Sequence, residues 1–268
     1  MISRRNFMAV VGAGLAGFRE VMGARARFQL GLGTFTYRGV TEDEMIDDLR
    51  ALKITRIEVS HPPYHLPAVK LDAVRSLKAK LDRAEIRVPS YFCRVIQTES
   101  DLDLAVHVAK TFGARHVTGV AVGDTLKVID ARFGREGLRF GIHNHWYRGR
   151  KFEYESPENL LSALKGLSDR VGVTFDCGHM ASCGYDPVEA LTKLWDHVQL
   201  VHLKDVESAG DDKNVILGHG IAETRAVVDL LKRRAFSDLV AIEYEAAPQN
   251  PQADVARCVE FARNLMGA

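Results

Sequence analysis

Apolar runs and amphipathic helical patterns alternate along the chain from Phe28 onward, with a repeat of roughly 30 residues. Eight apolar runs indicate strands, at 28–35, 54–60, 86–93, 115–121, 138–145, 172–176, 198–204 and 239–245. Helical patterns follow them at 42–52, 69–83, 102–112, 125–132, 157–167, 187–197, 223–234 and 253–266. Because parallel strands need a helical connection between neighbours, eight such units with short links predict a single α/β domain, a (β/α)8 TIM barrel.

The composition fits one such domain and excludes several classes of function. The 268 residues are a usual length for one α/β barrel, and 36 basic residues nearly balance 35 acidic ones. A net charge of +1 gives no electrostatic basis for binding nucleic acid or an anionic membrane surface. The four cysteines have neither CxxC spacing nor the density of a disulfide-rich scaffold.

The first 26 residues contain two competing motifs. A G-x-G-x-x-G pattern at 12–17 suggests a dinucleotide site, but the strand that follows it at 28–35 lacks the acidic residue that such a site requires. The pair Arg4-Arg5, followed by a weakly hydrophobic stretch, resembles a twin-arginine export signal with a cleavage site near 24–26. We therefore expect a signal peptide at 1–26 and the barrel at 27–268, in a periplasmic or otherwise exported protein with no membrane segment in its mature form. A disordered N-terminus on a cytoplasmic protein is the alternative.

Polar side chains gather at the carboxyl ends of the predicted strands, which is where barrels of this kind carry their chemistry. They are Glu58 and His61 on the second strand, His143 and His145 on the fifth, Asp176 and His179 on the sixth, His202 and Lys204 on the seventh, and Glu243 and Glu245 on the eighth. Residues two apart on a strand point to the same side, so the paired residues 143 and 145 share a face, as do 202 and 204. Five of the ten histidines lie at or just past strand ends, which packing alone does not explain.

Asp176, His202 and Glu243 come from three successive strands and are expected to project toward the barrel axis. A lone histidine at a strand end is more often a hydrogen-bonded core residue. Buried carboxylates without a cation would be costly, however, and the three residues together indicate a metal site. Oxygen and imidazole ligands suit Mn²⁺, Zn²⁺, Co²⁺, Fe²⁺ or Mg²⁺, so the sequence predicts a divalent metal ion without selecting its identity.

Five motifs carry a resemblance to a known family. GIHNHW (141–146), FDCGHM (175–180), LVHLKD (200–205), LGHG (217–220) and AIEYE (241–245) resemble, in this order, motifs of the xylose isomerase-like TIM barrels, which include sugar phosphate isomerases and epimerases. The resemblance implies metal ligands at His143, Asp176, His202 and Glu243 and a substrate contact at His179. The chain departs from the family pattern at His143, where a glutamate is usual. Imidazole can bind a metal, but it lacks the role of a carboxylate as one of two opposed proton carriers.

Several further residues are candidates for catalysis or substrate binding. Proton transfer is assigned to Glu243, His145, Glu58 and Lys204, and the lysine could also neutralise an oxyanion. Ion pairs are the structural alternatives, for Lys204 with Asp205 and for Glu58 with Arg56 or Arg94. Trp146 and His61 are candidate substrate contacts near the barrel mouth, and His219 lies in a glycine loop after the seventh strand.

Together these features predict a divalent-metal-dependent sugar isomerase or epimerase that abstracts a proton α to a carbonyl through an enediolate. One alternative is a keto-sugar or keto-glycoside lyase or hydratase that eliminates a β-substituent. The absence of a glutamate at position 143 and the predicted export favour that alternative. Another is a non-catalytic carbohydrate-binding barrel. The partner is in each case a small carbohydrate, and the sequence leaves open which sugar it is, whether it is phosphorylated and whether the chain forms a homo-oligomer.

Overall fold

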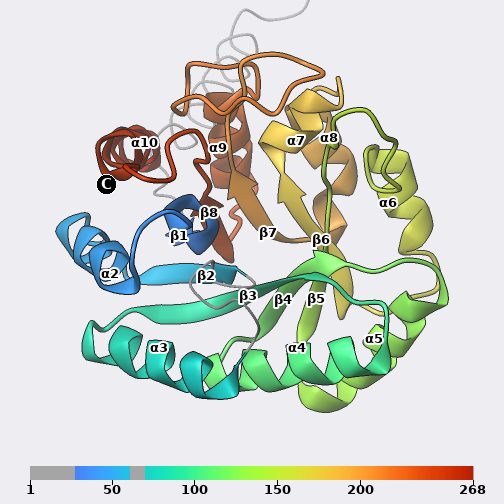
Figure 1. Ribbon diagram of the computed structural model, residues 1–268. Coiled ribbons are helices and arrows are strands. Elements are labelled where there is room, and N and C mark those ends of the chain that lie inside the picture. The colour runs from blue at the N-terminus through green and yellow to red at the C-terminus, as the bar shows by residue number, and fades with distance from the viewer. Residues whose placement is uncertain (1–27, 61–69, 268) are drawn as a thin grey trace, which may run out of the picture.

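A closed barrel of eight parallel strands forms the centre of the computed structural model, and helices surround it (Figure 1). The structure describes residues 28–60 and 70–267, so the predicted export signal at 1–26 and His61 lie outside the described residues. The strands are β1 (Gln29–Gly33), β2 (Arg56–Ser60), β3 (Arg87–Val95), β4 (His116–Val120), β5 (Arg139–His143), β6 (Val171–Asp176), β7 (Val198–Leu203) and β8 (Leu239–Ile242). Each strand pairs with the next one in sequence, and β1 pairs with β8 to close the ring. The predicted (β/α)8 barrel is confirmed.

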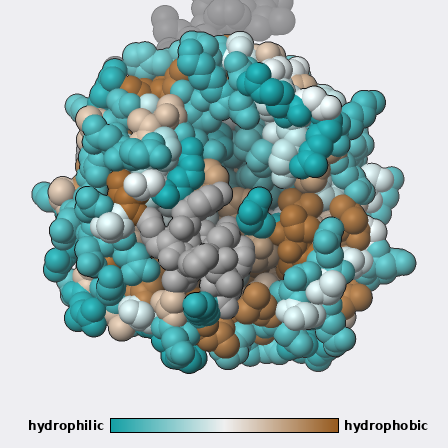
Figure 2. Space-filling view, viewed as in Figure 1, coloured by the Kyte–Doolittle hydropathy of each residue, from teal (hydrophilic) through white to brown (hydrophobic). Residues whose placement is uncertain are grey.

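Helices cover the outside of the barrel (Figure 1). They are α2 (Glu42–Ala51), α3 (Leu71–Arg83), α4 (Glu99–Phe112), α5 (Asp124–Glu136), α6 (Pro157–Ala163), α7 (Cys177–Ser182), α8 (Pro187–Leu194), α9 (Thr224–Arg233) and α10 (Gln252–Met266), with 3-10 turns η1 (Thr34–Tyr37) and η2 (Trp195–His197). Within the described part of the chain, none of these helices has the length and apolar character needed to cross a membrane. The surface in Figure 2 is mostly hydrophilic, in keeping with the balanced charge.

Two helices begin at a polar residue that is followed directly by proline. Ser156 precedes Pro157 and its Oγ accepts a hydrogen bond from the backbone N–H of residue 159 at 3.1 Å. Asp186 precedes Pro187 and its carboxylate accepts the N–H groups of residues 188 and 189. Proline fits the first turn because its fixed φ is helical and the N–H it lacks would have no partner inside the helix. Both caps therefore set where a strand-to-helix connection ends.

Most strands are shorter than expected, and the early ends of β5 and β8 change how the site is built. The β5 ladder ends at His143 and the β8 ladder at Ile242, so His145, Glu243 and Glu245 lie on the segments that follow the strands. A short helix that the periodicity did not predict, α7, follows β6 directly. The functional side chains are thus carried partly by strand ends and partly by the first residues beyond them.

The barrel interior is narrow and partly polar. Gly141 of β5 pairs in register with Thr118 and with Gly172, and a Cβ at position 141 would lie 2.2 Å from Thr174 Oγ1 and 2.8 Å from His116 Nε2. Only glycine fits there, because a Cβ would overlap these two side chains. Buried polar side chains therefore fill the axis beneath the strand ends, while the apolar core lies between barrel and helices.

Candidate metal and substrate site

Asp176 is the fixed point of the site at the carboxyl ends of the strands. Asn144 accepts a hydrogen bond from the Asp176 N–H at 2.8 Å and donates one to its carbonyl oxygen at 2.9 Å. One carboxylate oxygen, Oδ1, caps helix α7 by accepting the His179 N–H at 2.8 Å. The side chain is fully buried, and its other oxygen, Oδ2, has no hydrogen-bond partner among the described residues. The local fold therefore holds this carboxylate rigidly and leaves one oxygen available.

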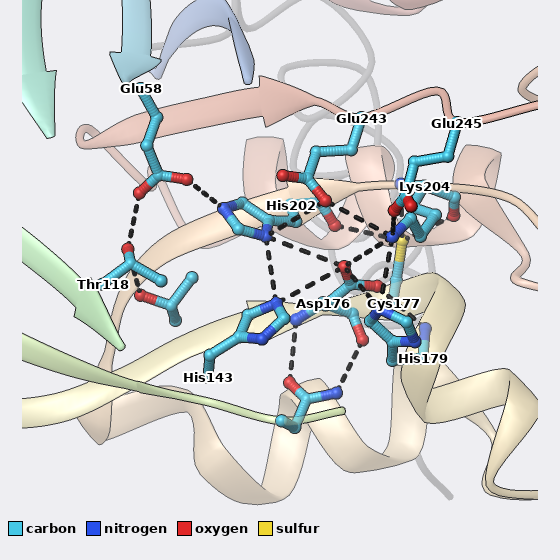
Figure 3. A network of polar contacts seen from close by, with 12 residues as sticks. Glu58, Thr118, His143, Asp176, Cys177, His179, His202, Lys204, Glu243 and Glu245 are labelled. Carbon is cyan, nitrogen blue, oxygen red and sulfur yellow. Dashed lines mark hydrogen bonds and ion pairs between the residues drawn. The ribbon is translucent and has the colours of Figure 1, made fainter. Parts of the chain in front are cut away.

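Four side-chain nitrogens surround that free oxygen (Figure 3). His143 Nε2, His202 Nδ1 and Lys204 Nζ each lie 3.7 Å from Asp176 Oδ2, and His179 Nε2 lies 4.0 Å from it. These separations are too long for hydrogen bonds. Ligand atoms that share one cation at about 2.0–2.2 Å lie roughly 3.3–3.6 Å apart in a tetrahedral arrangement, and His143 Nε2 is 3.2 Å from His202 Nδ1. The 3.2 Å contact is also a hydrogen-bond distance between the two imidazoles, and the 3.7 Å separations slightly exceed the tetrahedral spacing. The side chains therefore lie close to the positions that they would take around a common ion.

Glu243 supplies a further carboxylate on the eighth-strand side. Its Oε2 lies 3.7 Å from His202 Nδ1 and 3.3 Å from Lys204 Nζ, and its Oε1 has no hydrogen-bond partner in the described chain. The ligand-type atoms form two trios that share His202: one with His143 and Asp176, the other with Glu58 and Glu243. Either trio could hold a divalent ion. That His143, Asp176, His202 and Glu243 act as one ligand set stays a prediction.

Glu58 lies beneath this cluster rather than beside a substrate space. It is fully buried, and its two oxygens accept hydrogen bonds from Ser90 Oγ at 2.6 Å and Thr118 Oγ1 at 2.5 Å and face His202 Nε2 at 2.5 Å. Burial alone would raise the pKa of Glu58, but the His202 charge and these hydrogen bonds lower it to about 2. A carboxylate on the far nitrogen fixes the orientation of a ligating imidazole. The contact with Glu58 therefore orients the His202 ring. Neither of the arginines considered from the sequence, Arg56 or Arg94, forms an ion pair with the Glu58 carboxylate.

His202 shows why the cluster suits a cation. Burial would lower the pKa of this imidazole, yet the carboxylates of Glu243, Glu58 and Asp176 raise it well above its ordinary value. The imidazolium then carries positive charge at the centre of the acidic residues. A divalent ion would supply that charge directly, because a ligating imidazole is neutral.

Lys204 is a second buried positive charge. Burial would lower the pKa of its amine, but the charges of Glu245, Asp176 and Glu243 raise it above the ordinary value, so the side chain stays protonated. Its Nζ is hydrogen-bonded to Glu245 and lies 3.2 Å from His179 Nε2. The ion pair with Asp205 considered from the sequence is absent from the described contacts, since Asp205 accepts backbone N–H groups instead.

A cavity of about 150 Å³, here called the carboxyl-end cavity, opens above the cluster. Five of the predicted site residues line it: His143, His145, His179, Lys204 and Glu243. His145 and His179 stack with ring centroids 3.8 Å apart. Burial, followed by nearby positive charge, lowers the pKa of His145 to about 3, so this ring is neutral. One wall of the cavity is therefore a pair of uncharged imidazoles.

Other predicted contacts lie elsewhere. Trp146 does not line the cavity, and its ring lies 6.0 Å from the Arg148 guanidinium carbon. Tyr147 lines the wall in its place and stacks on His145 at 4.1 Å. His219 is exposed on its loop, where the N–H groups of the flanking glycines bind Asp205 at 2.9 and 3.1 Å.

The glycine loop therefore holds a carboxylate of this chain rather than serving the cavity. Eight lining residues were not predicted as site residues, and Phe92, Arg94 and Glu245 are among them. The sequence places Glu245 with Glu243 at the end of the eighth strand but assigns it no role at the site.

The chain matches the model of the xylose isomerase-like TIM barrel over residues 46–265. It belongs to this family. Among curated proteins, none matches the sequence significantly. Among solved structures, the fold is similar to the probable 3-DHS dehydratase AsbF from Bacillus anthracis at 12% identity and a TM-score of 0.73, over 87% of this chain and 98% of that one.

Two further solved structures share the fold. The IolI protein with a binding zinc atom has 15% identity and a TM-score of 0.72 and covers 90% of this chain and 98% of its own. L-ribulose 3-epimerase has 14% identity and a TM-score of 0.69, over 90% of this chain and 95% of that one. At these identities the likeness establishes the architecture. The reaction has to be argued from the site of this chain.

Proposed function

We propose that the protein is a divalent-metal-dependent enzyme that removes a proton α to the carbonyl of a sugar, as a sugar isomerase or epimerase does. The observation that carries the proposal is a pair of buried trios of ligand-type side chains that share His202, one with His143 and Asp176 and the other with Glu58 and Glu243. In the first trio the unpartnered oxygen of Asp176 lies 3.7 Å from nitrogens of both histidines. His143, Asp176, His202 and Glu243 would hold the ion. When bound, it would polarise the carbonyl and make the neighbouring C–H more acidic.

The remaining side chains of the cavity have complementary roles in this proposal. Glu243 has one free oxygen, Oε1, that can accept the proton from the substrate. Lys204 is held as a cation and can stabilise the oxyanion that develops when the proton leaves. The stacked His145 and His179 form an uncharged wall that can accept or donate hydrogen bonds to sugar hydroxyls.

Elimination is the second candidate, because the two walls of the cavity differ. Among the described lining residues, the carboxylates are Glu243 and Glu245, which both follow β8, whereas the wall from β5 carries His143 and His145. Exchange of a proton between two opposed carboxylates is therefore unavailable. This asymmetry favours reactions with one carboxylate base, namely isomerisation on one face of the sugar, or β-elimination with an imidazole assisting the leaving group.

Metal content and proton exchange test the proposal together. The purified protein is analysed for bound metal and then incubated with keto-sugars and keto-glycosides in D₂O under NMR observation. We expect about one divalent ion per chain and exchange or transfer of the α-proton. Movement of the carbonyl to the neighbouring carbon indicates isomerisation. Loss of a substituent indicates elimination. A protein that binds carbohydrate but holds no metal and moves no proton would instead be a non-catalytic binding barrel.

A further inference from the structure

A second cavity opens at the opposite end of the barrel, where the strands begin. Its volume is about 540 Å³, which is within the range of small-molecule sites, and we call it the amino-end cavity. Arginines occupy the starts of neighbouring strands around it: Arg56 on β2, Arg87 on β3, Arg115 just before β4 and Arg139 on β5. Parallel strands that begin at the same level thus place four guanidinium groups around one opening.

Positive charge exceeds negative charge in this lining. Two acids pair with two of the bases, Asp82 with Lys78 at 2.5 Å and Asp238 with Arg139 at 2.9 Å. The other three arginines, Arg56, Arg87 and Arg115, have no ion-pair partner among the residues that the structure describes. Arg56 and Arg87 are register partners on adjacent strands, where like charges repel. An anion between them would relieve this repulsion.

Two buried polar atoms at the inner end of the cavity are independent evidence that a ligand binds there. His116 and Gln199 line the cavity at 3% and 7% exposure, and His116 Nε2 and Gln199 Oε1 have no hydrogen-bond partner within the described chain. Unsatisfied buried groups of this kind cost free energy. They mark a place where a ligand can supply the missing partners.

The hydrogen-bond chemistry shows that both atoms are acceptors. Ser90 has one hydroxyl hydrogen, which it donates to Glu58 Oε1 at 2.6 Å, so at 3.0 Å it accepts from His116 Nδ1. The Nδ1 then carries the ring proton, and Nε2 is left with a lone pair. Gln199 likewise uses its amide N–H on the Asp169 carbonyl and leaves its oxygen free. A ligand must therefore bring hydrogen-bond donors to the inner end and negative charge to the rim.

We propose that the amino-end cavity binds a small hydroxylated anion with two or more negative charges. Its charged groups contact Arg56, Arg87 and Arg115, and its hydroxyls donate to His116 Nε2 and Gln199 Oε1. Guanidinium groups bind carboxylate and phosphate in the same bidentate manner, so a hydroxy-polycarboxylate and a polyol phosphate share the required chemistry. This site is independent of the proposed reaction, because the two cavities have no lining residue in common.

Calorimetric titration of the full chain tests the proposal with four probes. Malate and glycerol 3-phosphate represent the two sources of the anion, succinate lacks the hydroxyl, and glycerol lacks the charge. We expect saturable binding of malate or glycerol 3-phosphate, weaker binding of succinate and none of glycerol. Whichever of the two anions binds more tightly identifies the source. Absence of saturable binding for both anions would overturn the proposal.

Matched variants locate the binding. The double variant Arg87→Gln/Arg115→Gln changes two exposed side chains and should weaken binding at least about tenfold, since each charge-assisted hydrogen bond contributes strongly. The control Arg135→Gln/Arg233→Gln removes two exposed arginines outside the cavity and should bind as the wild type does. Asp176→Asn, in the buried cluster at the carboxyl end of the barrel, should also bind normally, which separates this result from any failure of the proposed reaction. Equal binding by the cavity variant and the control contradicts the proposal.

The hydroxyl contact has its own variant. Gln199→Met keeps the side-chain volume but removes the free oxygen, together with the amide N–H that binds the Asp169 carbonyl. The single hydroxyl of malate can then donate only to His116 Nε2, so the preference for malate over succinate should become smaller. A preference for malate as large as in the wild type would show that the hydroxyl does not bind Gln199.

Discussion

At the carboxyl ends of the strands the charged side chains are buried and face one another, whereas at the amino ends the unpaired arginines border a wider opening. Asp176, His202, Lys204 and Glu243 are at most 4% exposed, while Arg87 and Arg115 are exposed. Charges that have lost their water interact strongly, so small displacements at the carboxyl end have large energetic consequences. Solvated charges at the amino end can attract an anion but stabilise the fold little. The contrast separates an end suited to chemistry from an end suited to binding.

A hydrogen-bonded chain joins the two ends through the barrel. His202 Nε2 faces Glu58, Glu58 accepts from Ser90, and Ser90 accepts from His116, which lines the amino-end cavity. Every link is buried. The four predictions below test how differently the two ends respond to loss of a charge, beginning with the largest expected effect.

Asp176→Asn should have the largest effect. Asparagine can still cap α7 through its side-chain oxygen, but it removes the negative charge that the surrounding nitrogens share. We expect bound metal to fall from about one equivalent to near zero and turnover to fall roughly a thousandfold or more, because a metal ligand is lost. Metal analysis and a turnover assay measure the two quantities.

The control for this variant is Asp186→Asn. Asp186 also caps a helix, α8, but its carboxylate is exposed and its hydrogen bonds go to the N–H groups of residues 188 and 189. It should retain metal and turnover. Full metal occupancy in Asp176→Asn would remove Asp176 from the ligand set.

His116→Gln should change how stability depends on pH. Burial lowers the pKa of His116 from 6.5 to about 4, so the unfolded chain takes up this proton first and the folded state loses stability as pH falls from about 6.5 toward 4. A difference of this size corresponds to at most about 3 kcal/mol. Urea unfolding of the metal-free protein between pH 7 and 4.5 should show a steeper loss for the wild type than for the variant.

His145 and His179 contribute in the same direction, since burial also lowers their pKa, whereas the carboxylates around His202 raise its pKa and give the opposite contribution. The difference between wild type and His116→Gln isolates one residue from that background. His107→Gln, on the exposed face of α4, serves as the control and should follow the wild type. Parallel curves for wild type and His116→Gln would mean that the buried ring is not held neutral.

Glu58→Gln tests whether the carboxylate acts through His202. Glutamine can still accept the hydroxyl hydrogen bonds of Ser90 and Thr118, but it no longer places a negative charge on His202 Nε2. We expect metal affinity to fall about 10- to 100-fold, as for other partners that orient a ligating imidazole. A competition titration with a metal chelator gives the affinity.

Two comparisons make this result specific. Glu207→Gln removes an exposed carboxylate on the loop after β7 and should leave metal affinity unchanged. If Glu58→Gln lowers thermal stability while metal affinity stays within twofold of wild type, Glu58 is a structural residue and does not orient His202.

Glu58 also illustrates how far the sequence alone leads. The eightfold alternation of strands and helices predicts the barrel. The rule that chemistry lies at strand ends then selects Asp176, His202, Lys204 and Glu243. Both predictions depend on the local periodicity of the sequence. The partner of Glu58 is 144 positions away in sequence, and no periodic pattern specifies which residue faces it across the barrel. The sequence also leaves open which of the rings of Trp146 and Tyr147 faces the cavity. The turn after β5 determines this, and the strand pattern does not extend to that turn.

The smallest effect is expected for the ion pair between Arg139 and Asp238 at the amino end. Both guanidinium nitrogens contact the carboxylate, at 2.9 and 3.2 Å, but the side chains are 34% and 42% exposed. Solvent screening limits such pairs to about 0.2–1 kcal/mol. A double-mutant cycle with Arg139→Gln and Asp238→Asn, measured by urea unfolding, should give a coupling energy in this range. A coupling well above it would show that the amino end is more strongly desolvated than its exposure indicates, and the contrast between the two ends would then be one of geometry rather than of solvation.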